Sequence, residues 1–361
     1  MNTTIYDPFS VCFSSLKLKY KVYDDSLSKK NIIKPFDKVN VFINLETVFK
    51  NITMIIDLEK KIYLKQDFDI LLISNILNLA AHYKRFFVNN RLDTKVYLYY
   101  TDLDSTDFSQ KKYNDEYRYY YLEKFNRNPR FVYLTEQLKK SILPNAKTYC
   151  DFIPNVYMIS GKNIEGSLIP YIIGKMEPVR KNFIIGGEIY DTQYSLIDNY
   201  CNHYVNRNAK TQAILSSIDG YLSILSKTRS ENTADSEYIF NKYPMYVSLL
   251  AVLGDKVRSI ESVYGFGLSK FKKLLESDDS GVINNSSPET IADIFEDNDL
   301  KSDFKNNFYC TSIKDMFNEL TEADKKSIEV QLTDRLDINS IKSLNNTVFY
   351  NHPLILEGLL I

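Results

Sequence analysis

Four short apolar runs of strand length recur through the amino-terminal half of the chain. They are rich in β-branched and aromatic residues and lie at residues 39–45, 95–100, 156–159 and 182–185. Segments with helical spacing of apolar residues lie at 69–87, 131–143, 167–175 and 191–201, the second ending before Pro144 and the third interrupted by Pro170. Strands that alternate with helices predict the α/β class, with a central, mostly parallel sheet flanked by helices.

A glycine turn between two helical runs marks a second unit, at residues 246–276. An apolar run ends at Gly254, and a Gly-Phe-Gly turn at 265–267 precedes a basic run that starts at Ser269, a candidate N-cap. Glycine at both ends of this turn frees the backbone to turn tightly, and its N–H groups would bind phosphates without reading sequence. An ordinary helix–turn–helix packing unit is the alternative. The residues expected to contact DNA here are Gly265, Gly267, Ser269, Lys270, Lys272 and Lys273.

This unit resembles the helix–hairpin–helix of flap endonucleases and of bacterial and phage 5′→3′ exonucleases, which have a PIN-like α/β domain. The family's template is an apolar helix, Gly-Asp, a second Asp, Asn-Ile-Pro-Gly-Val, and then Gly-Ile-Gly-Pro-Lys. The positions that fit in register are Gly254, Asp255, Ile260, Val263, Gly265, Gly267, Lys270, Leu274 and Leu275. Arg258 stands where the second Asp belongs, and Glu261-Ser262 replaces Pro-Gly. The resemblance covers residues 39–276 and implies a flap-nuclease fold.

The family binds Mg²⁺ with carboxylates beyond the carboxyl ends of its strands, and most of these acids are replaced here. Asn44 stands for the Asp of the first strand, residues 164–167 read Ile-Glu-Gly-Ser for Glu-Ala-Asp-Asp, and Tyr190 and Arg258 replace two more acids. The acids that the resemblance retains are Asp102 (or Asp104), Glu188 and Asp255. Three convergent carboxylates could hold one Mg²⁺ but not two. The resemblance therefore implies a scaffold that has lost its two-metal site; no other cofactor is expected, apart from a monovalent cation at the hairpin.

A basic, tyrosine-rich section at residues 111–130 lies where the family has a helical arch that grips a single strand. The resemblance implies that Lys111, Lys112 and Arg118 contact DNA there, with neighbouring tyrosines available for base stacking. A tyrosine-rich amphipathic helix also serves as packing, and this alternative stays open.

The formal net charge of −1 conceals two regions of opposite sign. Residues 276–361 contain 7 Lys and Arg and 17 Asp and Glu, a net of −10, so the rest, with 38 and 29, carries +9. This asymmetry favours a nucleic-acid-binding body whose acidic C-terminal region screens it or docks a protein partner, against two independently solvated surfaces. The predicted units are a peripheral segment 1–37, the α/β domain 38–211, the helix–hairpin–helix subdomain 212–277 and an acidic helical region 288–361, after a linker at 278–287.

Other features bear on compartment and origin. Four scattered cysteines, no apolar N-terminal run before a cleavage site, and no stretch of about 18 apolar residues predict a cytoplasmic protein without membrane contact. Abundant Asn, Ile, Lys and Tyr, with 28 Tyr and no Trp, resembles the usage of an AT-rich genome such as a phage's, whose protein would work in the bacterial host's cytoplasm.

Three functions remain open on this sequence. The first is a catalytically degenerate flap-nuclease-like protein, acting as a DNA-binding or structural subunit of a phage nucleic-acid-processing or virion assembly. The second is an active 5′→3′ exonuclease or flap endonuclease with a reduced metal site. The third is a protein–protein scaffold without DNA binding. The number of replaced acids favours the first over the second and does not separate the first from the third.

Overall fold

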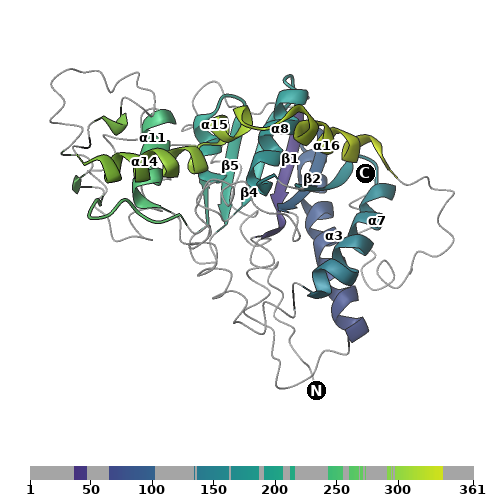
Figure 1. Ribbon diagram of the computed structural model, residues 1–361. Coiled ribbons are helices and arrows are strands. Elements are labelled where there is room, and N and C mark those ends of the chain that lie inside the picture. Colours follow the sequence, from purple (N-terminus) through teal and green to yellow (C-terminus); the bar gives the residue numbers. More distant parts are fainter. Residues whose placement is uncertain are drawn as a thin grey trace.

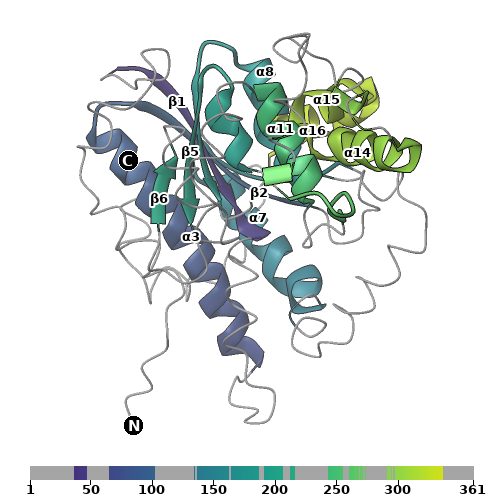
Figure 2. The ribbon, with the colours of Figure 1, turned by 90° about the vertical axis from the view of Figure 1, so that its left-hand side faces the viewer.

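A six-stranded sheet, in the order β3-β2-β1-β4-β5-β6, forms the centre of the molecule (Figures 1 and 2). The computed structural model describes residues 36–46, 65–101, 136–161, 164–186, 191–205, 212–215, 243–254, 260–267 and 297–335, with 134, 269–270, 273, 291–293 and 295. The strands are β1 Lys38–Asn44, β2 Asp93–Thr101, β3 Val156–Gly161, β4 Lys181–Gly186, β5 Tyr200–Val205 and β6 Gln212–Leu215. Strands β1 to β5 pair in parallel and β6 is antiparallel to β5, which confirms the predicted α/β class.

Helices cover both faces of this sheet. Figure 2 shows α3 on one side and α8, α15 and α16 on the other. The α-helices are α3 Lys65–Asn89, α7 Leu143–Phe152, α8 Ile169–Met176, α11 Tyr243–Leu253, α14 Asn298–Thr311, α15 Ile313–Asn318 and α16 Glu322–Thr333. A π-helical turn, η2 Leu138–Ile142, and two 3₁₀ turns, η3 Gly166–Leu168 and η4 Asp191–Leu196, complete the described set. Within the described ranges, no helix is both long and apolar enough to cross a membrane.

The period-two alternation of each strand divides the core into two layers. In β1, Val39, Val41 and Ile43 pack with α3 and α7, whereas Phe42 packs with α8 and the C-terminal helices. Successive side chains of a strand point to opposite faces, so a strand that is apolar on both faces has to be covered on both. The apolar runs read from the sequence are therefore strands of a doubly covered sheet.

Both prolines that were expected to limit helices instead lie in the first turn of one. Pro144 lies in the first turn of α7, which begins at Leu143 directly after the π-helical turn η2, so the helix predicted to end before this proline continues to Phe152. Pro170 lies in the first turn of α8 and does not interrupt it. The missing N–H of proline has no intrahelical partner at that position, so it costs little there.

One helical prediction was wrong because sheet pairing overrides local spacing. Residues 191–201 form only the 3₁₀ turn η4, after which Asn199 takes a left-handed φ of 68° and β5 begins at Tyr200. Residues 212–215, which were placed in the helix–hairpin–helix subdomain 212–277, form β6, which pairs with β5 across the predicted boundary at residue 211.

The acidic C-terminal helices are part of this core. Cys310, Ile313, Met316, Leu320 and Ile328 are buried in the layer that contains Phe42 and Ile184 of the sheet. Figure 1 shows α15 and α16, in yellow-green, lying across α8 and the strands. Helices α15 and α16 therefore cover one face of the sheet, whereas α14 packs against α11.

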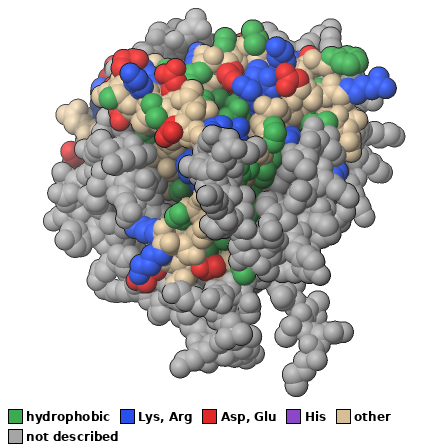
Figure 3. Space-filling view, turned by 90° about the vertical axis from the view of Figure 1, so that its right-hand side faces the viewer, with side chains coloured by type: hydrophobic (Ala, Val, Ile, Leu, Met, Phe, Trp, Pro, Cys, Tyr) green, Lys and Arg blue, Asp and Glu red, His purple; other side chains and the backbone are tan. Residues whose placement is uncertain are grey.

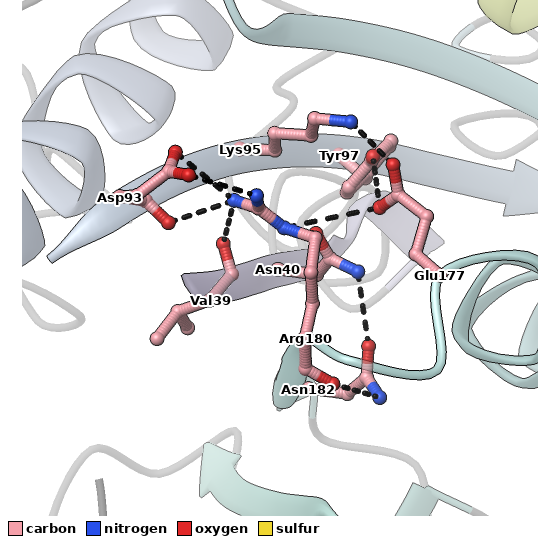
Figure 4. Close-up of polar contacts among 8 residues, drawn as sticks. All are labelled: Val39, Asn40, Asp93, Lys95, Tyr97, Glu177, Arg180 and Asn182. Carbon is pink, nitrogen blue, oxygen red and sulfur yellow. Dashed lines mark hydrogen bonds and ion pairs between the residues drawn. The ribbon is translucent and has the colours of Figure 1, made fainter. Parts of the chain in front are cut away.

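The amino edge of the sheet, where β1, β2 and β4 begin, is closed by a buried guanidinium (Figure 4). The Nε atom of Arg180 donates to Asn40 Oδ1 at 2.7 Å, and one terminal nitrogen, Nη2, donates to the carbonyl of Val39 at 3.0 Å and to that of Asp93 at 2.7 Å. Only 6% of Arg180 is exposed. Internal hydrogen bonds close this edge of the sheet. A functional site is therefore expected at the opposite edge.

His82 of α3 makes the stability of this domain depend on pH. Burial, and then the nearby Arg85, lower the pKa of His82 from 6.5 to about 4. The unfolded chain therefore takes up a proton near its ordinary pKa of about 6.5, while the folded chain does so only near 4. We expect the free energy of unfolding, measured by urea titration, to reach its full value above about pH 7. It should fall progressively as the pH is lowered toward about 4. In a His82→Gln variant this part of the slope should disappear; an unchanged slope would contradict the assignment to His82.

Candidate functional site

The carboxyl ends of the five parallel strands meet at one edge of the sheet, which we call the carboxyl edge. Strands β1, β2, β3 and β4 end there at Asn44, Thr101, Gly161 and Gly186. Tyr99 pairs with Asn44, and Thr101 pairs with Gly161. In open α/β sheets, ligands bind beyond such an edge, so the side chains there define the first candidate site.

Asn44, where the resemblance places an Asp, is held by two internal hydrogen bonds. Its Nδ2 donates to Asp191 Oδ2 at 3.0 Å, and its Oδ1 accepts from the backbone N–H of Glu46 at 2.9 Å. Only 3% of Asn44 is exposed. A neutral amide engaged at both ends supplies no charge to a metal ion, so this position works as a link within the protein.

Asp191 is the fully buried carboxylate of this edge. Besides Asn44, it faces the hydroxyl of Tyr99, which donates to Oδ1 at 3.4 Å. Burial, and then the charge of Asp191, raise the pKa of Tyr99 well above its ordinary value. A Cβ atom on Gly186 would lie 2.2 Å from Asp191 Oδ2, so glycine at the end of β4 makes room for this carboxylate.

Glu46 forms a second link, between β1, β2 and the segment before α8. Its Oε1 accepts from the backbone N–H of Thr101 at 2.8 Å and from the Thr101 hydroxyl. The same hydroxyl oxygen accepts from the N–H of Gly166 at 3.0 Å. A Cβ on Gly166 would lie 2.7 Å from the Thr101 nitrogen, so this close approach requires glycine.

These residues do not fit a two-metal centre. Two Mg²⁺ ions need several carboxylate oxygens that converge from different strand ends. Among the described residues, no group of three His, Cys, Asp or Glu side chains could hold a metal ion. Ile164, Gly166 and Ser167 supply no carboxylate, and both oxygens of Asp191 face donors of the protein itself. The acids predicted as remnants, Asp102 (or Asp104), Glu188 and Asp255, and the replacements Tyr190 and Arg258, lie outside the described residues.

Gln193, which the resemblance retains after the fourth strand, connects three elements. Its Nε2 donates to the carbonyl of Thr311 at 2.9 Å, and its Oε1 accepts from the Tyr243 hydroxyl at 2.8 Å and the N–H of Ile313 at 3.0 Å. Gln193 is fully buried. It joins the turn after β4 to the start of α11 and to the junction between α14 and α15.

The second candidate site is the hairpin that follows α11. Gly254 ends α11 with a φ of 64°, and the N–H of Val263 donates to the carbonyl of Val252 at 3.0 Å. Ile260 and Val263 are buried and anchor the segment. Gly265 has a φ of 71°, whereas Gly267 does not take a positive φ, so only one of the two glycines needs the conformational freedom expected for both.

Helix α14 holds this hairpin against α11. The Nδ2 of Asn307 donates to the carbonyl of Ala251 at 2.9 Å and to that of Glu261 at 2.7 Å. The Phe295 ring lies 5.0 Å from the ring of Phe266. The hairpin is thereby held by Asn307 of α14 and by Phe295, which precedes that helix.

The structure describes most of the residues expected to contact DNA at this turn. Gly265, Gly267, Ser269, Lys270 and Lys273 are all exposed. The ammonium of Lys270 donates to the carbonyl of Gly265 at 3.2 Å and lies 4.3 Å from the centre of the Phe266 ring, so it also braces the turn. A Cβ on Gly267 would have no atom within 4 Å, which leaves open space for a ligand. Four expected contact residues, Lys272, Lys111, Lys112 and Arg118, lie outside the described residues.

Four exposed acids lie beside the hairpin on the side of α14, and we call them the acidic flank: Glu261, Asp297, Asp299 and Asp303. Partial burial, then Asp299, Glu261 and Asp297, raise the pKa of Asp303. The hairpin thus lies between lysines that follow the turn and carboxylates beside the segment that precedes it.

On the described part of the face at α7 and α16, acidic and basic side chains are interspersed (Figure 3).

Sequence reasoning missed the links made by Glu46, Tyr99 and Thr101 at the carboxyl edge. Glu46 follows the end of β1 by two residues, and Tyr99 and Thr101 lie on one face of β2 at its end. Polar residues at strand ends were the available signal, but the resemblance pointed only to the positions of the family's acids. The register between β1 and β2 decides which of them meet, and one strand's pattern does not contain it.

Comparison with known proteins identifies the fold. No protein-family model and no curated protein matches this sequence. The D15 protein of bacteriophage T5, crystallised with metal ions, is 16% identical to this chain, with a TM-score of 0.50 over 81% of this chain and 98% of that one. The chain has the flap-endonuclease fold. A T5 D15 flap endonuclease pseudo-enzyme–product complex with DNA and metal ions is 15% identical over the same shares, with a TM-score of 0.49. At these identities the likeness is one of fold.

Proposed function

We propose that this chain is a catalytically degenerate flap-nuclease-like protein. It acts as a DNA-binding or structural subunit of a nucleic-acid-processing or virion assembly, of phage origin, in the cytoplasm of a bacterial host. The observation that carries the proposal is Asn44, which stands where the family has a metal-binding Asp and donates to the buried Asp191 at 3.0 Å. An edge closed by such hydrogen bonds keeps its shape without a metal ion.

DNA is the proposed partner, and the hairpin is the proposed contact. Its exposed glycines and the lysines at 270 and 273 combine peptide N–H groups with positive charge, which suits phosphates of any sequence. The body before residue 276 carries a net +9. The T5 relative named above binds DNA in its complex, which supports the same partner class for this chain.

One observation favours the alternative of an active 5′ nuclease with a reduced metal site. The charges of Asp191 and of Glu46 both raise the pKa of Tyr99, so two carboxylates lie near one buried hydroxyl at the carboxyl edge. A single Mg²⁺ could recruit them only if their hydrogen bonds to Asn44 and Thr101 were broken. The absence of DNA binding would favour the third function, a protein–protein scaffold.

Incubation with flap and 5′-overhang DNA in Mg²⁺ or Mn²⁺ tests the proposal. We expect no cleavage, because the described edge lacks convergent acids, together with binding that weakens steeply as salt rises. Lys273→Ala should reduce the slope of log affinity against log salt by a little under one. Turnover that disappears in Asp255→Ala or Asp191→Ala, but persists in the exposed-site control Glu329→Ala, would establish the active nuclease. If no DNA is bound at low salt, the scaffold function replaces the DNA-binding one.

A further inference from the structure

An exposed tyrosine stands at the tip of the hairpin. Tyr264 is 86% exposed, immediately before the left-handed Gly265. Every other tyrosine whose side chain the structure describes is buried or half-buried. Its ring therefore contributes little to the core and presents its faces to solvent.

The backbone that carries this ring is fixed on both sides. Val263, just before it, is buried, and the N–H of Phe266 donates to the Val263 carbonyl at 3.1 Å across the turn. The Lys270 ammonium holds the carbonyl of Gly265. Since the turn is already ordered, a ligand that contacts the ring has only the side chain to immobilise.

The charges around the tip favour a narrow ligand. Lys270 and Lys273 follow the turn, whereas Glu261 and Asp303 of the acidic flank border its other side. A duplex presents two phosphate strands across its width, and one of them would approach the carboxylates. A single strand needs only the lysine side for its phosphates, and its unpaired bases are free to stack on an aromatic face.

We propose that Tyr264 stacks against a base of single-stranded DNA whose phosphates contact the hairpin. This inference rests on the proposed function, and it assigns the hairpin a single-strand preference and a specific stacking residue. Stacking of this kind tolerates any base, because every base has a π-face. Removal of the ring should weaken binding of single strands by about 5- to 100-fold.

The absence of tryptophan from the chain allows a direct test with the full-length protein. Tyr264→Trp introduces a single tryptophan, whose fluorescence should be quenched on titration with a short oligothymidine. In parallel, anisotropy should show that Tyr264→Ala weakens binding of the labelled single strand, while Tyr264→Phe retains it. Binding of a blunt duplex should change less than about twofold. Phe36→Ala, which removes another exposed ring, is the matched control and should bind like the parent.

The outcomes separate this inference from the function on which it rests. Single-strand binding that is unaffected by Tyr264→Ala, with no quenching in Tyr264→Trp, overturns the stacking inference and leaves DNA binding intact. Equal losses for single strand and duplex overturn the single-strand preference. If the parent protein binds neither form at low salt, the DNA-binding function fails, and the inference fails with it.

Discussion

Removal of residues 288–361 is expected to abolish cooperative folding. The deletion would expose the sheet layer that the C-terminal helices cover, where Cys310, Ile313, Met316, Leu320 and Ile328 are buried. Burial of one large apolar side chain stabilises a fold by roughly 1.5–3 kcal/mol. Several such losses together are comparable with the entire stability of a domain, about 5–15 kcal/mol.

The same deletion would uncover the outer edge of β3. The side-chain amide of Gln331 accepts from the N–H of Ser160 at 3.0 Å and donates to its carbonyl at 2.9 Å, so it occupies the place of a neighbouring strand. One terminal nitrogen of Arg335 donates to the carbonyls of Cys150, Ile153 and Val156 at 2.8, 2.9 and 3.1 Å. An uncovered edge strand pairs with other chains, so the truncated protein should also aggregate.

Circular dichroism melts and gel filtration of the truncated chain would measure both effects. Two full-length variants of α16 separate packing from charge. Ile328→Ala should lower the free energy of unfolding by about 2–5 kcal/mol, because that side chain is fully buried. Glu329→Ala, at the adjacent exposed position, should change it by less than about 0.5 kcal/mol. A truncated chain that stays monomeric and melts at the parent's midpoint would show that these helices are accessory.

The place of these helices in the core was beyond the reach of the sequence. Residues 276–361 read as a separate region because their net charge is −10 and a turn-rich linker precedes them. Helical spacing identifies an apolar face but does not say which surface that face covers. The predicted helical region 288–361 does contain α15, while the contacts of Ile313 and Met316 with the sheet depend on tertiary packing.

The four apolar runs were sufficient to predict the parallel part of the sheet. Each of them is a strand in the structure, because side chains that are apolar on both faces have to be covered on both. The helix predicted at residues 191–201 is absent, since β5 forms there through pairing with β4, and β6 in turn pairs with β5. Strand preference of this kind depends on context more than helix preference does.

At the carboxyl edge, sequence reasoning located Asn44 but not its partner. The sequence predicts that Asn44 ends a strand. Comparison with the Asp that the family has at this position shows that the charge is missing. The bond to Asp191 spans 147 residues and depends on a 3₁₀ turn where a helix was predicted. A hydrogen bond between side chains this far apart in the sequence could therefore be found only in the structure.

Replacement of Arg180 is expected to be the most damaging single change outside the apolar core. Its guanidinium makes its bonds to Asn40, Val39 and Asp93 with only 6% of the residue exposed, and Nη1 lies 3.2 Å from Asp93 Oδ2 (Figure 4). Around it, Glu177 accepts from the Tyr97 hydroxyl at 3.1 Å and pairs with Lys95. Burial, and then Glu177, raise the pKa of Tyr97, so this hydroxyl stays a donor.

Arg180→Met keeps an unbranched side chain, although a shorter one, and removes every donor. The carbonyls of Val39 and Asp93 and the amide oxygen of Asn40 then lose their partners, and the Glu177 carboxylate loses a cation 3.9 Å away. Leaving a buried acceptor without its donor costs about 1–3 kcal/mol, so the loss of several bonds should appear as a lower urea midpoint with an unchanged slope. Lys140→Ala is the matched control, because its pair with Glu136 is exposed and contributes no more than about 1 kcal/mol. If Arg180→Met keeps the parent's urea midpoint, water must hydrogen-bond to the acceptors at this edge. The guanidinium would then be dispensable for stability. A large loss in Arg180→Met with none in Lys140→Ala would place the domain's polar stabilisation at its amino edge, away from the carboxyl edge and the hairpin where function is proposed.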